Sequence, residues 1–152
     1  IISSYKSERM EAAQVLSGPN AQFDGDVEAF VHKVRDALYC SKMCSYAQGM
    51  ALLSKASSTY NFDLNLGECA RIWKGGCIIR AGFLNKIKHA FDENPGLPNL
   101  LMAPEFKQTI LDKQEAWREV VATAAKVGIA IPAFSASLDY FDSYRRDRLP
   151  QN

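Results

Sequence analysis

Six residues in this chain of 152 carry the thiol or imidazole groups that bind transition metals or take part in catalytic triads. They are four cysteines and two histidines: Cys40, Cys44, Cys69, Cys77, His32 and His89. Cys40 and Cys44 are four residues apart, so on a helix the two thiols would lie one turn apart and could share a metal ion with a third group. No Cys-x-x-Cys pair is present, and the histidines lie in charged surroundings. The pattern therefore favours buried core thiols and exposed histidines over a metal site or a catalytic triad.

Two cations stand in unusual places. Lys42 is the only charged residue between Ala37 and Leu53, so its ammonium must reach solvent or meet an anion. Arg80 follows the double glycine at 75–76 and is a candidate for an anion site. For both, we favour a structural interpretation, namely a lysine that reaches solvent or an ion pair within the domain. The five charged residues Asp142, Arg145, Arg146, Asp147 and Arg148 indicate a mixed-sign surface and not a phosphate clamp.

Composition and motifs exclude several classes of protein. The net charge is +1 with acidic and basic residues interspersed, which argues against a nucleic-acid partner. Neither a P-loop nor a Rossmann glycine fingerprint is present. Free cysteines, together with the lack of a signal peptide or glycosylation sequon, indicate a cytoplasmic protein. The chain opens at Ile1 and not at Met, so we expect it to be part of a longer polypeptide.

A long helix over residues 26–60 is predicted to position these groups. Asp26 is a suitable N-cap, and 35 helical residues would extend over roughly 50 Å. Small or apolar residues occupy every side of the segment 37–53, so we expect other helices to surround it, with Ser45 and Gly49 closely packed. Lys42 and Gln48 make the segment too polar for a membrane span. The prediction is a buried helix at the centre of an all-α domain.

Shorter helices are predicted before and after this one. Residues 1–16 form a helix that Gly18 and Pro19 end. Asn65 and Glu68 resemble a capping box, and the helix they begin should kink at the double glycine and resume from Cys77 to Phe91. Further helices begin at Pro104 and near Ala133, with a short apolar turn between 97 and 102. No segment alternates with period two, so the fold class is all-α: a multi-helix domain packed around one long central helix.

Seven short motifs, in order and at matching intervals, resemble the decarboxylating 6-phosphogluconate dehydrogenases. They are SSYKSER at 3–9, LSGP at 16–19, SYAQG at 45–49, WKGGCIIR at 73–80, NLL at 99–101, IPAFS at 131–135 and DSYR at 142–145. The resemblance covers essentially all of residues 1–152 and implies part of the C-terminal all-helical domain of that family. It also implies a homodimer and a cytoplasmic enzyme of the pentose phosphate pathway.

The implied reaction is an oxidative decarboxylation. 6-Phospho-D-gluconate is oxidised at C3 by NADP, the β-keto acid loses carbon dioxide, and the enediol is protonated to ribulose 5-phosphate. The family's coenzyme fingerprint, general-base lysine and acid glutamate are expected before Ile1, and a tail that reaches the partner subunit is expected after Asn152. The resemblance therefore assigns no catalytic residue, no cofactor-binding residue and no metal ligand to this chain, which alone should be inactive.

One substrate contact is implied within the chain. Ile78 matches the position in GGCIIR that approaches the substrate as a backbone or apolar wall, and the adjacent glycines would allow a close approach. Simple packing of Ile78 is an equally good interpretation. Two alternatives to an enzyme portion stay open: a stand-alone helical interaction or dimerisation module, and a metal or redox protein that uses the four thiols.

Overall fold

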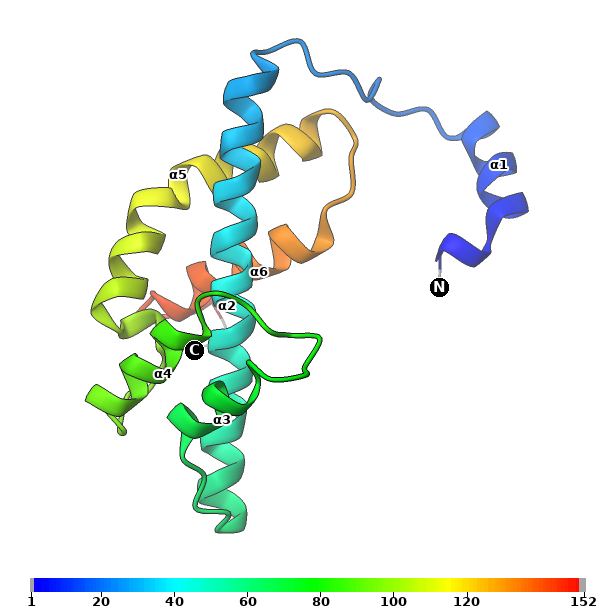
Figure 1. Ribbon diagram of the computed structural model, residues 1–152. Helices are drawn as coiled ribbons and strands as arrows, with labels where there is room; N and C mark the ends of the chain where they lie inside the picture. The colour runs from blue at the N-terminus through cyan, green and yellow to red at the C-terminus, as the bar shows by residue number, and fades with distance from the viewer. Residues whose placement is uncertain (1, 151–152) are drawn as a thin grey trace.

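The computed structural model describes residues 2–150, which contain helices and no strand. Ile1 of the predicted first helix lies outside this range. The elements are η1 (Ile2–Ser4), α1 (Lys6–Val15), α2 (Val27–Tyr60), α3 (Leu66–Ile72), α4 (Leu84–Glu93), η2 (Leu100–Met102), α5 (Pro104–Lys126) and α6 (Pro132–Tyr144). In Figure 1, α2 runs the full height of the molecule and the later helices lie along it. The predicted all-α fold around one long helix is confirmed.

Helix α2 begins and ends by local chemistry that its sequence provides. The Asp26 side chain accepts a hydrogen bond from the Ala29 N–H at 3.1 Å, as expected of an N-cap. The helix continues for 34 residues and stops at Asn61, whose left-handed φ of 55° suits asparagine better than most residues. The predicted bounds of the central helix are therefore confirmed.

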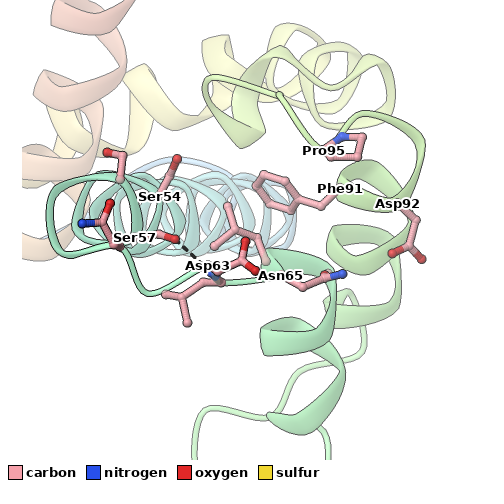
Figure 2. Close-up of a pocket in the computed structure, with 12 residues that line it drawn as sticks. Ser54, Ser57, Asp63, Asn65, Phe91, Asp92 and Pro95 are labelled. Carbon is pink, nitrogen blue, oxygen red and sulfur yellow. Dashed lines mark hydrogen bonds between the residues drawn. The ribbon is translucent and has the colours of Figure 1, made fainter.

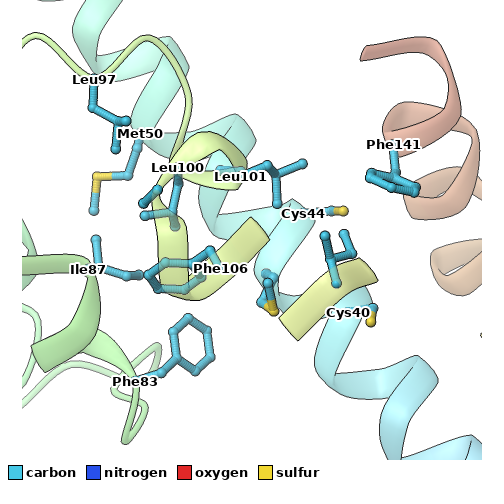
Figure 3. Close-up of a cluster of buried hydrophobic side chains, with 14 of the residues drawn as sticks. Cys40, Cys44, Met50, Phe83, Ile87, Leu97, Leu100, Leu101, Phe106 and Phe141 are labelled. Carbon is cyan, nitrogen blue, oxygen red and sulfur yellow. The ribbon is translucent and has the colours of Figure 1, made fainter. Parts of the chain in front are cut away.

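One face of α2 carries the core. Its buried residues are Ala37, Cys40, Ser41, Met43, Cys44, Ala47 and Met50. Figure 3 shows Met50 and the two thiols among side chains from η2, α4, α5 and α6. On α5, Trp117 is fully buried and its ring centroid lies 6.3 Å from that of Phe141 on α6. Removing apolar surface from water stabilises the folded state by about 25 cal/mol per Å2. This buried face is therefore the main source of the domain's stability.

Ion pairs join the same helices at their edges. Lys33 and Asp36 on α2 pair with Glu119 and Lys113 on α5, at 2.5 Å and 2.8 Å. These four side chains are partly exposed, so each pair adds little energy but favours one register of α5 on α2.

The opposite face of α2 is uncovered, which corrects the expectation of a helix buried all round. Leu38 is 48% exposed and Leu52 70%, and Ser45 is exposed. A Cβ at Gly49 would meet no heavy atom within 4 Å beyond its chain neighbours and its own helix backbone. The small residues on this face predicted close packing, but within residues 2–150 no helix packs against them.

Helix α1 stands apart from the rest of the molecule (Figure 1). It has no buried residue, and the predicted continuous helix is interrupted at Tyr5, between η1 and α1. The segment that follows lies close to the body at Pro19 and at Phe23. Phe23 stacks on Phe30 with ring centroids 4.4 Å apart, and a Cβ on Gly128 would lie 3.3 Å from Cδ of Pro19.

The start of α3 was predicted correctly, whereas the helix expected from Cys77 was not. The Asn65 side chain accepts from the Glu68 N–H at 2.9 Å, but the Glu68 carboxylate pairs with Arg71 and does not close the capping box. Residues 73–83 form turns, and α4 begins only at Leu84. Gly76 has a φ of 72°, which a helix cannot accommodate, so the break is longer than a kink.

No helix within residues 2–150 is both long enough and apolar enough to cross a membrane.

Candidate functional site

The predicted substrate contact, Ile78, lies on the loop of residues 73–83 between α3 and α4. A turn in which the Arg80 N–H donates to the Cys77 carbonyl at 3.2 Å leaves the side chain of Ile78 fully exposed. Exposure of this kind is unfavourable for an isoleucine and argues against the alternative that Ile78 packs within this chain. The contact with substrate stays a prediction.

A cavity of about 400 Å3 separates this loop from the uncovered face of α2. Its lining residues are Lys42, Ser45, Tyr46, Gly49, Trp73, Ile78, Ile79 and Arg80. The Tyr46 hydroxyl donates a hydrogen bond to the Ile79 carbonyl and fastens the loop to α2. The missing side chain at Gly49 leaves part of this space open.

An aromatic cluster lies next to Tyr46, which lines the cavity. The Phe83 ring lies edge-on to Tyr46 and Tyr39, with centroids 4.9 Å and 5.8 Å apart, and it also contacts Phe106 at 6.3 Å. Partial burial raises the pKa of Tyr46, and the nearby Cys77 adds to this effect. The phenol is therefore neutral at physiological pH and remains a hydrogen-bond donor to the loop.

The two cations that stood out in the sequence meet at this cavity. Lys42 is exposed, as expected of a lysine that reaches solvent, and its Nζ lies 5.7 Å from the centroid of the Phe83 ring. Arg80 is also exposed, and the ion pair expected for it is not formed within residues 2–150. None of the eight lining residues is acidic. The cavity therefore combines an apolar, aromatic wall with two positive charges.

Comparison with known proteins identifies the family. A family model described as the C-terminal domain of 6-phosphogluconate dehydrogenase matches residues 1–152. The chain belongs to this family. The resemblance inferred from the seven motifs is confirmed.

Relatives of known name agree with the family model. The chain is 72% identical to "6-phosphogluconate dehydrogenase, decarboxylating" of Synechococcus elongatus, covering 100% of the chain and 32% of that protein. Against the Staphylococcus aureus (strain N315) protein of the same name the identity is 54%, over 99% of the chain and 32% of the relative. The chain thus spans about a third of the length of the relatives it matches.

A solved structure has the same fold. The 6-phosphogluconate dehydrogenase of Plasmodium falciparum superposes with a TM-score of 0.93 at 43% identity, covering 99% of this chain and 33% of that one. Its title describes an apo form and complexes with the cofactor NADP+ and the substrate 6-phosphogluconate. The correspondence of nearly the whole chain includes the segment of α1, which stands apart from the other helices here.

The thiols and imidazoles of this chain do not converge on one site. Within residues 2–150, no three His, Cys, Asp or Glu side chains are placed to hold a metal ion. Burial raises the pKa of both Cys40 and Cys44 to about 12, so these thiols are protonated and unreactive. His89 is exposed and lies 3.3 Å from Glu93, one turn along α4.

The charged segment after residue 141, predicted as a mixed-sign surface, forms ion pairs through Asp142. Both oxygens of Asp142 accept from Arg118 on α5, at 2.7 Å and 2.5 Å, and Oδ1 also accepts from Arg145 at 2.8 Å. The hydrogen bonds from Arg118 hold the pKa of Asp142 well below its usual range. The network fixes the end of α6 against α5.

A second, larger hollow lies where α2 ends and α3 begins (Figure 2). Its volume is about 850 Å3, and the lining includes Ser54, Ser57, Asp63, Phe91 and Asp92. The Ser57 hydroxyl accepts from the Leu64 N–H at 2.9 Å and so stabilises the turn. The polar groups here serve the connection between helices, and none of them points to a reaction.

Sequence reasoning identified some residues of the 400 Å3 cavity and missed others. Ile78, Lys42 and Arg80 were singled out, whereas Tyr46 and Trp73 were not assigned to a site. Both aromatic residues belong to motifs shared with the family, SYAQG and WKGGCIIR, so the signal was present. What the sequence lacked was the fold of the loop, which brings the two motifs to one cavity.

Proposed function

We propose that this chain is the C-terminal helical part of an NADP-dependent, cytoplasmic oxidative decarboxylase of the pentose phosphate pathway. The reaction converts 6-phospho-D-gluconate to ribulose 5-phosphate and carbon dioxide. The observation that carries the proposal is the family match over residues 1–152, supported by relatives named for this reaction. The Plasmodium falciparum structure, described with NADP+ and 6-phosphogluconate, supports the same coenzyme and substrate.

The role of this part is to provide a scaffold and one wall of the substrate site. Residues 2–150 contain no strand followed by a glycine-rich turn, so they do not fit a dinucleotide, and another part of the polypeptide would bind NADP. The reacting acid and base would also lie elsewhere, because the described titratable groups form no acid–base pair in the cavity. The chain alone is therefore expected to show no turnover.

Ile78 is the residue through which the chain would touch substrate. Its apolar side chain is fully exposed on a loop held by the hydrogen bond from Tyr46 to Ile79. Contact with a ligand would remove this side chain from water, which stabilises the complex by roughly 1.5 to 3 kcal/mol for a fully buried isoleucine. Gly75 and Gly76 next to it carry no side chain that would obstruct the approach.

Homodimer formation is the second part of the proposal. The uncovered face of α2 presents Leu38 and Leu52, and α1 presents Met10 and Val15 at 61% and 78% exposure. Apolar surface on this scale is characteristic of an interface. Burial of the α2 face between subunits would restore the all-round burial that its small residues predict. Sedimentation of the full-length protein as a stable monomer would contradict this part.

The experiment that tests the reaction is an NADP-dependent assay of the full-length protein with 6-phosphogluconate. We expect reduction of NADP with release of carbon dioxide, and none from residues 1–152 alone. Ile78→Asp should raise KM for 6-phosphogluconate, whereas Ile72→Asp, at a position 57% exposed on α3 and outside the cavity, should leave it unchanged. No turnover by the full-length protein would favour the alternative, a non-catalytic interaction or dimerisation module.

A further inference from the structure

Ile78 occupies a position that packing within the described residues does not maintain. Its side chain is fully exposed, although an isoleucine gains stability when it is removed from water. The cavity of about 400 Å3 lies between the loop of residues 73–83 and α2, so few apolar contacts support the loop from that side. A loop with few buried contacts moves easily. A specific bond is therefore needed to keep Ile78 in place.

The hydrogen bonds within the loop fix its local shape. The Arg80 N–H donates to the Cys77 carbonyl at 3.2 Å and closes the turn that carries the isoleucine. The Lys74 ammonium donates to the Asn85 side chain at 2.6 Å and so connects the two ends of the loop. Neither bond reaches α2. These contacts shape the turn of residues 77–80 but do not set its position relative to the helix.

Tyr46 supplies the connection to α2. Its hydroxyl donates to the carbonyl of Ile79, the residue that follows Ile78. The ring of Tyr46 packs edge-on against Phe83 with centroids 4.9 Å apart, and Phe83 in turn contacts Phe106 in the core. Phe83 is only 6% exposed, so the core sets the position of the hydroxyl. A bond from this hydroxyl to the backbone then orients the adjacent side chain.

We infer that Tyr46 is a positioning residue, whose hydroxyl holds Ile78 through the Ile79 carbonyl at the place where substrate meets it. The inference rests on the proposed function, in which Ile78 contacts 6-phosphogluconate. A wall that is held in advance lowers the entropy lost when a ligand binds, so the effect falls on binding. Tyr46 acts through the loop and not on the reacting atoms, so the bound substrate should react at an unchanged rate.

The test is steady-state kinetics of the full-length protein with Tyr46→Phe, which removes the hydroxyl and keeps the ring against Phe83. We expect KM for 6-phosphogluconate to rise about three- to tenfold, as for the loss of one hydrogen bond, with kcat within about twofold of the wild type. Tyr39→Phe is the matched control. The Tyr39 ring lies edge-on to the same Phe83 ring at 5.8 Å, but Tyr39 does not line the cavity, so KM should stay unchanged.

A double-mutant cycle tests whether Tyr46 acts through Ile78. Ile78→Ala removes most of the side chain that is positioned. In that background Tyr46→Phe should raise KM much less than it does in the wild type, because residues that act as a unit are not additive. Equal rises in KM in both backgrounds would show that Tyr46 acts independently of Ile78 and would overturn the inference.

Amide hydrogen exchange provides a readout that needs no turnover. The N–H groups of residues 77–82, that of Arg80 included, should exchange about three- to tenfold faster in Tyr46→Phe than in the wild type. Tyr39→Phe should leave these rates unchanged. Equal exchange rates in Tyr46→Phe and the wild type would mean that the hydroxyl does not hold the loop.

The outcomes separate this inference from the proposed reaction. An active wild type together with an unchanged KM in Tyr46→Phe would overturn the inference alone. No turnover by the wild type would overturn the proposed reaction and the positioning role with it, whereas the exchange rates would still show whether Tyr46 fastens the loop to α2.

Discussion

The two faces of α2 differ in what covers them. On one face Cys40, Met43, Cys44 and Ala47 have no exposed surface, and α5 and α6 pack directly against them. On the other face Leu52 is 70% exposed and Gly49 has open space beside it. A single helix is thus both the centre of a core and part of the molecular surface.

This difference separates what the chain stabilises by itself from what it offers to other parts of a protein. The helices that pack on the buried face lie within residues 2–150, so substitutions on this face should change the free energy of unfolding of the chain. The uncovered face has the small and apolar residues typical of close helix packing but no partner in the described part of the chain. Variants of the two faces should therefore affect different measurements.

The largest effect on the buried face is expected from Trp117→Ala. Trp117 is fully buried, so its removal leaves a large cavity and should lower the free energy of unfolding by about 3 to 5 kcal/mol. Its indole Nε1 has no hydrogen-bond partner among the described residues, so Trp117→Phe should cost clearly less. Denaturant unfolding of both variants measures the difference, and Trp73→Ala, at a ring only partly buried against the core, should cost less than Trp117→Ala.

The ion pair between α5 and α6 should give stability that depends on pH. The pKa of Asp142 is depressed in the folded state by Arg118, so its contribution is fully present above the unfolded value of about 4 and is lost as pH falls through the folded value. Asp142→Asn should lower stability at pH 7 by about 1 to 3 kcal/mol and flatten the decline below pH 4. Identical acid unfolding profiles for wild type and variant would contradict this.

A direct comparison of the two faces introduces a leucine on each. Ala47→Leu places extra volume in a filled core and should lower the free energy of unfolding by about 1 to 3 kcal/mol. Ser45→Leu, on the exposed face, should have little effect on folding of residues 1–152 but should weaken self-association of the full-length protein. Thermal unfolding and sedimentation measure these two outcomes. Equal destabilisation of the isolated chain by both would show that the faces do not differ.

The last prediction concerns the order in which the four thiols react, and it involves no change in stability. The pKa of Cys40 and Cys44 is raised to about 12 by burial, so at pH 8 both should resist alkylation until the protein unfolds. Cys69 and Cys77 are partly exposed and should react first. Mass spectrometry after timed alkylation gives the order. Early labelling of Cys44 would show that the core face opens more easily than its packing implies.

Features set by neighbouring residues were predicted well. The cap at Asp26, the cap at Asn65, the proline that begins α5 and the left-handed Gly128 that follows it all depend on chemistry within a few residues. The exposed face of α2 and the detached α1 were not predicted, because coverage depends on partners far away in sequence. The turns of 77–83 were missed because Ile78 and Phe83 fit an apolar helical pattern that the glycines override.

The two contacts of the segment before α2 limit how far α1 can travel. With Pro19 against Gly128 and Phe23 on Phe30, only residues 16–18 lie between the last turn of α1 and the nearer contact. Three extended residues span about 10 Å, so the last turn of α1 stays within that distance of Pro19 while Pro19 lies beside Gly128. Such a tether keeps the effective concentration of α1 high beside any surface within that reach and lowers the entropy lost when it docks.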